Sequence, residues 1–139
     1  MPAIRHHVHI ASTPRKVWAA LTTAEGLMNW WVDEARVDSR KGGRVVIEFE
    51  DDEGNPVEAR GMIHTFRPTS HFEIVWDHMG DFPNRGSRMA FKVARDGEEV
   101  RVSLVHSGGP LLEDEEQREA MIKEWRRDMR ALQGLLDDA

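Results

Sequence analysis

The chain of 139 residues carries a formal net charge of −6 and contains no cysteine, and these properties exclude several classes of protein. The length suits one domain, residues 1–139, with a single core, and the charge argues against general binding to nucleic acid. Disulfides, thiolate catalysis and cysteine-ligated zinc are excluded, and because neither a ~20-residue apolar run nor a secretory signal is present, we expect a cytoplasmic protein with no membrane span.

A strand and two short helices are predicted first. Residues 4–10 alternate between apolar and polar, which is typical of a half-buried strand. Pro14 suits the first position of a helix, where its missing N–H costs nothing. Thr22, followed three residues later by Glu25, matches a capping box, so we expect a second short helix that begins at Thr22 and ends near Asn29.

Six strands joined by short turns are predicted next. Apolar residues recur with a period of two between residues 35 and 106, interrupted by the polar tip 51–56 and an Asp-Gly turn at 96–97. The facing of strand 57–66 is ambiguous, and a bulge near Thr65 would reconcile its two apolar sets. Short connections require antiparallel neighbours, so the strands form a meander.

The last predicted element is a single long helix from Glu113 to about Leu136, with apolar residues three and four positions apart. Its acidic first residues suit the helix dipole. At 1.5 Å per residue it spans ~36 Å, enough to cover the one buried face of the sheet. A curved sheet around this helix leaves a wedge of space, one end of which the two short helices close.

Several short motifs follow one another along nearly the whole chain. They are Val17-Trp18-x-x-Leu21, Trp30-Trp31, Gly42-Gly43, Gly61-x-Ile63 before Arg67-Pro68, Ile74-Val75-Trp76, and Trp125 in the last helix. Their order resembles the START-like (SRPBCC) superfamily, and within it the branch similar to the C-terminal domain of activators of the Hsp90 ATPase. The chain departs from the family pattern at Glu124, where a glycine is frequent, and after His106, where an aromatic residue is frequent.

The resemblance implies an α+β helix-grip fold with a deep cavity. The expected architecture is a curved antiparallel sheet of about seven strands (β-α-α-β6-α) wrapped around the long C-terminal helix. The candidate ligand-binding residues on the inner faces are Trp30, Trp31, Ile63, Trp76, Met89, Phe91, Leu104, His106, Trp125 and Met129.

The tryptophans have an alternative role as core packing, because buried indoles remove large apolar areas from water. We expect Trp18 to close one end of the fold, and Trp76 and Trp125 to face each other across the cavity. A buried indole N–H without a hydrogen-bond partner would indicate a ligand nearby.

The irregular segment 77–86 is longer than most hairpin connections. It carries Met79 and Phe82, which we expect on the surface as a lid over the cavity mouth. A small satellite cluster or a dimer contact would explain the two residues equally well.

The histidines are weaker candidates for chemistry. His106 continues an inward-facing set and would contact a ligand carboxyl or carbonyl group, or simply the backbone. His7 and His9 share a strand face, but no carboxylate nearby in the sequence completes a ligand set, so no metal is expected.

The sequence therefore favours non-catalytic binding of a small, largely hydrophobic molecule by a monomer or homodimer, with no cofactor and no catalytic residue assigned. One alternative is a co-chaperone that acts on a chaperone ATPase of the Hsp90 type in the stress response, although the first strand starts at Ile4, without the additional N-terminal domain of two-domain activators. The other alternative is a cyclase- or dehydratase-like enzyme that uses His106, although no acid–base pair is visible.

Overall fold

The computed structural model describes residues 2–137, which form seven strands and four helices. In chain order these are β1 (Ala3–Ile10), α1 (Pro14–Thr22), α2 (Ala24–Trp30), β2 (Glu34–Val37), β3 (Arg44–Glu50), β4 (Pro56–Arg67), β5 (His71–Trp76), β6 (Ser87–Asp96), β7 (Glu99–Gly108), α3 (Pro110–Glu113) and α4 (Glu115–Leu136).

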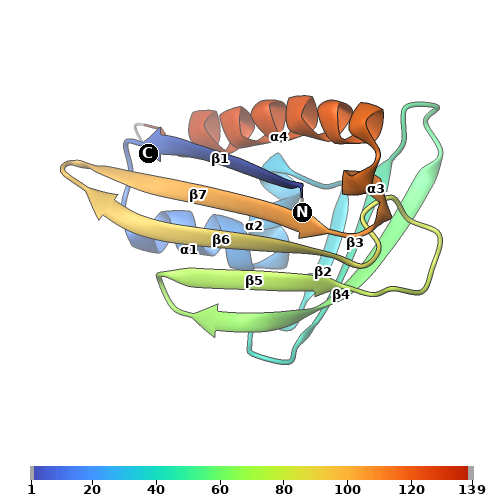
Figure 1. The fold of residues 1–139 in the computed structure, drawn as a ribbon. Coiled ribbons are helices and arrows are strands. Elements are labelled where there is room, and N and C mark those ends of the chain that lie inside the picture. The colour runs from blue at the N-terminus through green and yellow to red at the C-terminus, as the bar shows by residue number, and fades with distance from the viewer. Residues whose placement is uncertain (1, 138–139) are drawn as a thin grey trace.

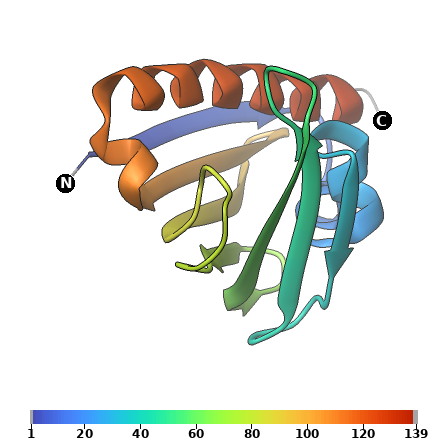
Figure 2. The same cartoon turned by 90° about the vertical axis from the view of Figure 1, so that its right-hand side faces the viewer.

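The strands form one antiparallel sheet in the order β1-β7-β6-β5-β4-β3-β2, so that β1 and β2 are the edges. The sheet is strongly curved, with α4 running along β1 and with α1 and α2 on the same side (Figures 1 and 2). This arrangement confirms the predicted α+β class and the curved sheet around a long C-terminal helix. It brings the concave face, α2 and α4 together around one interior.

The second short helix begins one residue later than predicted. Thr23, rather than Thr22, is its N-cap, and the Thr23 hydroxyl accepts a hydrogen bond from the Gly26 N–H at 3.0 Å. Thr22 instead ends α1 and donates its hydroxyl to the Trp18 carbonyl at 2.8 Å. The two helices approach so closely that a Cβ on Gly26 would lie 2.3 Å from the carbonyl oxygen of Ala19.

The predicted single closing helix is wrong at its start. Asp114 has an extended backbone conformation and separates α3 from α4, so Glu113 ends α3 instead of opening the long helix. The Asp114 carboxylate accepts a hydrogen bond from the Gln117 N–H at 3.0 Å, which is the usual role of an aspartate N-cap. Glu115 and Glu116 then occupy the first turn of α4, where the dipole favours negative charge.

The predicted bulge in β4 is confirmed, since the register with β5 shifts between Ile63 and Thr65. Before the bulge, Ala59, Gly61 and Ile63 are buried, and after it Phe66 joins the core. Gly61 pairs with Trp76, and a Cβ there would lie 2.9 Å from the Trp76 ring. Glycine therefore lets this indole lie directly over β4.

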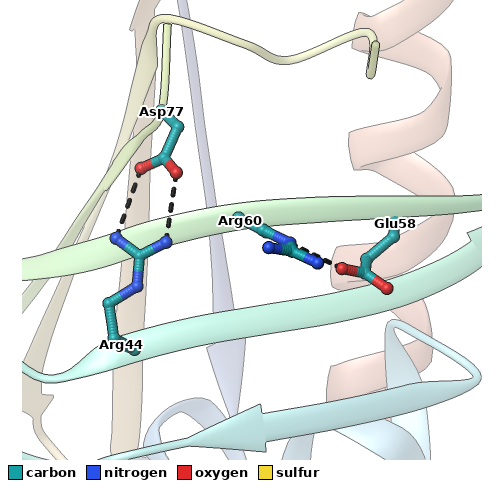
Figure 3. A network of polar contacts seen from close by, with 4 residues as sticks. All are labelled: Arg44, Glu58, Arg60 and Asp77. Atoms are coloured by element: carbon teal, nitrogen blue, oxygen red, sulfur yellow. Dashed lines mark hydrogen bonds and ion pairs between the residues drawn. The ribbon is translucent and has the colours of Figure 1, made fainter. Parts of the chain in front are cut away.

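The outer face of β3 and β4 carries two ion pairs (Figure 3). Arg44 donates to both carboxylate oxygens of Asp77, at 3.5 and 3.1 Å, and Arg60 donates to Glu58 at 2.6 Å. The backbone of Asp77 is also bonded to Arg60 and Gly86. Exposed pairs contribute little stability, but together these bonds fix both ends of the segment 77–86.

Candidate ligand-binding site

The predicted site residues lie at the interior between the sheet and the helices. Trp31 is half-buried, and the other nine are buried members of the core: Trp30, Ile63, Trp76, Met89, Phe91, Leu104, His106, Trp125 and Met129. Most of them therefore pack against one another, which is the alternative that the sequence left open for the indoles.

Trp31 contacts both of the tryptophans that were expected to face each other. Its ring stacks on Trp125 with centroids 5.7 Å apart and an interplanar angle of 24°, and it lies 6.4 Å from Trp76 at 57°. Trp30 also stacks on Trp31, with ring centroids 5.9 Å apart, and donates its indole N–H to the Ala20 carbonyl. A third indole thus fills the space in which a ligand between Trp76 and Trp125 was predicted.

A directed chain of hydrogen bonds holds His106 in the core. The Trp125 indole N–H donates to Nδ1 of His106 at 3.0 Å, and Nε2 lies 3.0 Å from the Ser87 hydroxyl, which itself donates to the Asn84 carbonyl at 2.6 Å. Because Nδ1 accepts and the Ser87 proton is already used, the imidazole is neutral with its hydrogen on Nε2. The chain links α4 to β7, to β6 and to the segment 77–86.

Burial of His106 strongly favours the neutral form of its imidazole. His106 is 0% exposed, and loss of hydration lowers its pKa from 6.5 to about 4. Both ring nitrogens are occupied by protein groups, so the imidazole in this arrangement positions Trp125 and Ser87.

Beside the packed core lies a cavity of about 430 Å³. Its walls come from the chain just after α2, from β3 and the hairpin tip, from the segment 77–86, from Met89 of β6 and Leu111 of α3, and from residues 117–128 of α4. Farther along α4, Met129 and Leu132 are fully buried and fill the space against the sheet. Along α4 the cavity is therefore lined by residues between Gln117 and Asp128.

Three of the predicted ligand-binding residues line this cavity, namely Trp31, Met89 and Trp125. The remaining lining residues are Val32, Asp33, Ile47, Phe49, Glu50, Asp51, Asp52, Pro83, Asn84, Leu111, Gln117, Ala120, Met121, Glu124, Arg127 and Asp128. The acidic members were missed by sequence reasoning. The one available signal was the departure from the family pattern at Glu124, which does lie in the wall.

The two predicted lid residues of the segment 77–86 differ in exposure. Met79 is 83% exposed, but Phe82 is only 4% exposed and packs edge-on against Trp76, so the expectation that both are on the surface is wrong for Phe82. The next two residues, Pro83 and Asn84, line the cavity. Phe82 thus anchors the segment that borders the mouth.

Trp76 meets the criterion set for a ligand contact but lies outside the cavity wall. Its indole is 1% exposed, and its Nε1 has no hydrogen-bond partner within residues 2–137. At the other end of the fold Trp18 packs against Phe66 and Phe72, as expected. The unpaired N–H of Trp76 is therefore a property of the packed core beside the site.

The cavity carries a strongly negative set of side chains. Burial is the main cause that raises the pKa of Glu124 and of Asp128, and the neighbouring Arg127 opposes this rise in both. Within the described residues no three histidine, aspartate or glutamate side chains come together as a metal site. None of the described helices is long and apolar enough to cross a membrane.

The curved sheet, the long C-terminal helix and the cavity beside it define a helix-grip domain of the START-like (SRPBCC) type. The chain belongs to the family described as activator of Hsp90 ATPase homolog 1-like protein, whose model matches residues 11–137. No curated protein is similar enough in sequence to count as a match.

Solved structures share this fold at low sequence identity. The Aha1 dimer from Colwellia psychrerythraea is 20% identical, with a TM-score of 0.81 over 99% of this chain and 98% of that one. The AHSA1-like protein from Aeromonas hydrophila is 16% identical, with a TM-score of 0.75 and coverage of 96% and 93%. CalU16 from Micromonospora echinospora is 21% identical, with a TM-score of 0.72 and coverage of 96% and 74%.

Proposed function

We propose that this protein binds a small, largely apolar molecule in the cavity between β3 and α4, without catalysing a reaction. The observation that carries the proposal is the cavity itself, whose volume of about 430 Å³ falls within the ~300–1,000 Å³ typical of small-molecule sites. Its walls combine the apolar side chains of Trp31, Met89, Met121 and Trp125 with polar and acidic side chains.

A pair of matched substitutions on α4 tests this proposal. Ala120 is exposed at the cavity wall, whereas Ala131 is exposed on the same helix away from it. Binding of the neutral apolar dye N-phenyl-1-naphthylamine, followed by its fluorescence, should be lost in Ala120→Phe and retained in Ala131→Phe. Equal binding by both variants, or no binding by the unsubstituted protein, would contradict the proposal.

The second candidate is an activator of an Hsp90-type ATPase, which the family membership favours. ATPase rates of the Hsp90 from the same organism, measured with an excess of this protein and with the Ala120→Phe variant, test it. Stimulation by the unsubstituted protein would support this activity. No stimulation would end it.

Other inferred properties depend on the first two candidates. A cytoplasmic location and a part in the stress response follow from an Hsp90-type partner. A homodimer is suggested by the Aha1 dimer among the similar structures, and sedimentation equilibrium would distinguish it from a monomer. No observation favours a cyclase- or dehydratase-like activity, because both nitrogens of His106 are bonded within the protein.

A further inference from the structure

We infer that the cavity selects an organic cation, an amine or ammonium group attached to an apolar body. This inference depends on the proposed binding function and names its ligand class. It comes from the charge of the wall, from its aromatic side chains and from one unpaired acceptor.

The charge of the cavity wall is strongly unbalanced. Its acidic residues are Asp33, Glu50, Asp51, Asp52, Glu124 and Asp128, and Arg127 is the sole basic residue among the lining side chains, all of which lie within residues 2–137. Arg127 is 72% exposed and bonds Asp128 at 3.2 Å, so it sits at the rim. A cleft with walls of one sign concentrates ions of the opposite sign.

The carboxylates differ in how far the protein already uses them. Asp51 accepts hydrogen bonds from the backbone N–H groups of Glu53 and Asn55, at 3.0 and 2.8 Å, and so stabilises the hairpin tip. Glu124 and Asp128 lie one turn apart on α4, and the Asp128 side chain is only 14% exposed. A bound cation stabilises half-buried carboxylates of this kind most, because it replaces the water that burial has removed.

The aromatic walls suit the apolar part of the ligand as well as its charge. Trp125 stands between Glu124 and Asp128 in sequence, and Trp31 stacks on it. Indoles pack against alkyl and aryl groups, and they also attract cations over their faces. Carboxylates beside indoles form a combination that favours an amine over a neutral or anionic analogue.

Asn84 provides an independent indication of a ligand that donates hydrogen bonds. It lines the cavity and is 5% exposed, and its side-chain Oδ1 has no partner in the described part of the chain. Its backbone carbonyl is held by the Ser87 hydroxyl and N–H, which fixes the residue at the wall. An amide oxygen accepts but does not donate, and this one is covered by protein atoms, so an ammonium N–H in the cavity would satisfy it once the Asn84 side chain turns towards the ligand.

Three probes with the same phenylbutyl body test the inference: 4-phenylbutylamine, 4-phenylbutanol and 4-phenylbutyrate. Isothermal titration and ¹H–¹⁵N NMR titration at neutral pH should rank the amine as the tightest ligand and the carboxylate as the weakest. Loss of the charge-assisted bonds in Glu124→Gln and Asp128→Asn should weaken the amine roughly tenfold each, change the affinity of the alcohol much less, and raise the affinity of the carboxylate. Glu98→Gln, in the β6–β7 turn, is the matched control and should change none of the three.

The outcomes separate this inference from the proposed function. If the alcohol binds as tightly as the amine, or if the two α4 variants leave amine binding unchanged, the cavity binds ligands but the cation selectivity is wrong. If none of the three probes binds while N-phenyl-1-naphthylamine does, the inference fails and the proposed function stands; if the dye does not bind either, both fail.

Discussion

At the scale of single residues, the indole hydrogen bonds determine which tryptophan is most costly to change. The Trp125 N–H donates to His106, whereas the buried Trp76 N–H has no partner in the described residues. The two rings are otherwise comparable, since both are buried in the same core. Their difference isolates the contribution of one buried hydrogen bond.

We predict that Trp125→Phe is more destabilising than Trp76→Phe by about 1–3 kcal/mol. Both substitutions remove the same atoms, but Trp125→Phe also leaves Nδ1 of His106 as a buried acceptor without a donor. Urea unfolding of the two variants measures the difference. Equal losses, or a larger loss for Trp76→Phe, would show that the hydrogen bond has no such role.

The buried imidazole of His106 makes stability depend on pH. Its pKa falls to about 4 in the folded state from 6.5 when exposed, so between these values the unfolded chain binds a proton that the folded protein does not. The contribution of His106 to the free energy of unfolding is therefore complete above pH ~6.5. It is lost as the pH falls towards about 4, and the total loss is about 3 kcal/mol.

Unfolding of the unsubstituted protein and of His106→Asn between pH 7.5 and 4 measures this contribution. Asparagine keeps a side-chain acceptor and donor but does not titrate. The variant should be less stable at neutral pH and should lose less stability on acidification. An identical pH dependence in both proteins would contradict the assignment.

At the scale of elements, helix α4 has two parts with different roles. Met129, Leu132 and Leu136 are buried along the last two turns of the helix, whereas Glu124 and Asp128, which precede them, line the cavity. A raised pKa in the folded state means that the charged carboxylate is less stable there than in the unfolded chain. At neutral pH these two charges therefore oppose folding.

We predict that Glu124→Gln and Asp128→Asn each raise the thermal unfolding temperature at pH 7 in the absence of ligand. For the same reason, the gain in unfolding temperature should shrink as the pH falls, because the carboxylates of the unsubstituted protein then take up protons. Differential scanning fluorimetry across this range, with Glu98→Gln as the control, measures it. Lower unfolding temperatures for both variants would contradict the prediction.

The sequence predicted these elements well where the apolar periodicity was strong. It predicted them less well where a single polar side chain determines at which residue a helix begins. The alternating strands, their antiparallel order and the bulge near Thr65 are confirmed. The break at Asp114 was missed because an aspartate inside a helical pattern differs from an N-cap only by its local backbone. Thr22 and Thr23 are the same residue type and equally suited to an N-cap by sequence, but only the Thr23 hydroxyl accepts the hydrogen bond from the Gly26 N–H.

The site was harder to predict than the fold, because cavities depend on which side chains fail to meet. The inward faces of Ile63, Phe91 and Leu104 follow from alternation, but their mutual packing places them in the core instead of the cavity wall. Trp31 follows a helix end, so its position between Trp76 and Trp125 depends on the chain path after α2. The hairpin tip 51–56 reaches the cavity only through the curvature of the sheet.

At the scale of the whole molecule, the sheet and α4 enclose a packed core at one end and an open, acidic cavity at the other. Family membership and the likeness to known structures establish the fold, and the cavity carries the proposed function. The five tryptophans are distributed over both regions. Trp31 and Trp125 line the cavity, whereas Trp18 lies at the far end against Phe66 and Phe72.

The most direct test is therefore a ¹H–¹⁵N NMR titration of the protein with N-phenyl-1-naphthylamine, observed at the five indole N–H signals. The signals of Trp31 and Trp125, assigned by single substitutions to phenylalanine, should shift with saturation while that of Trp18 stays in place. Unchanged indole signals at saturating dye, or shifts that spare Trp31 and Trp125, would contradict a ligand-binding cavity between β3 and α4.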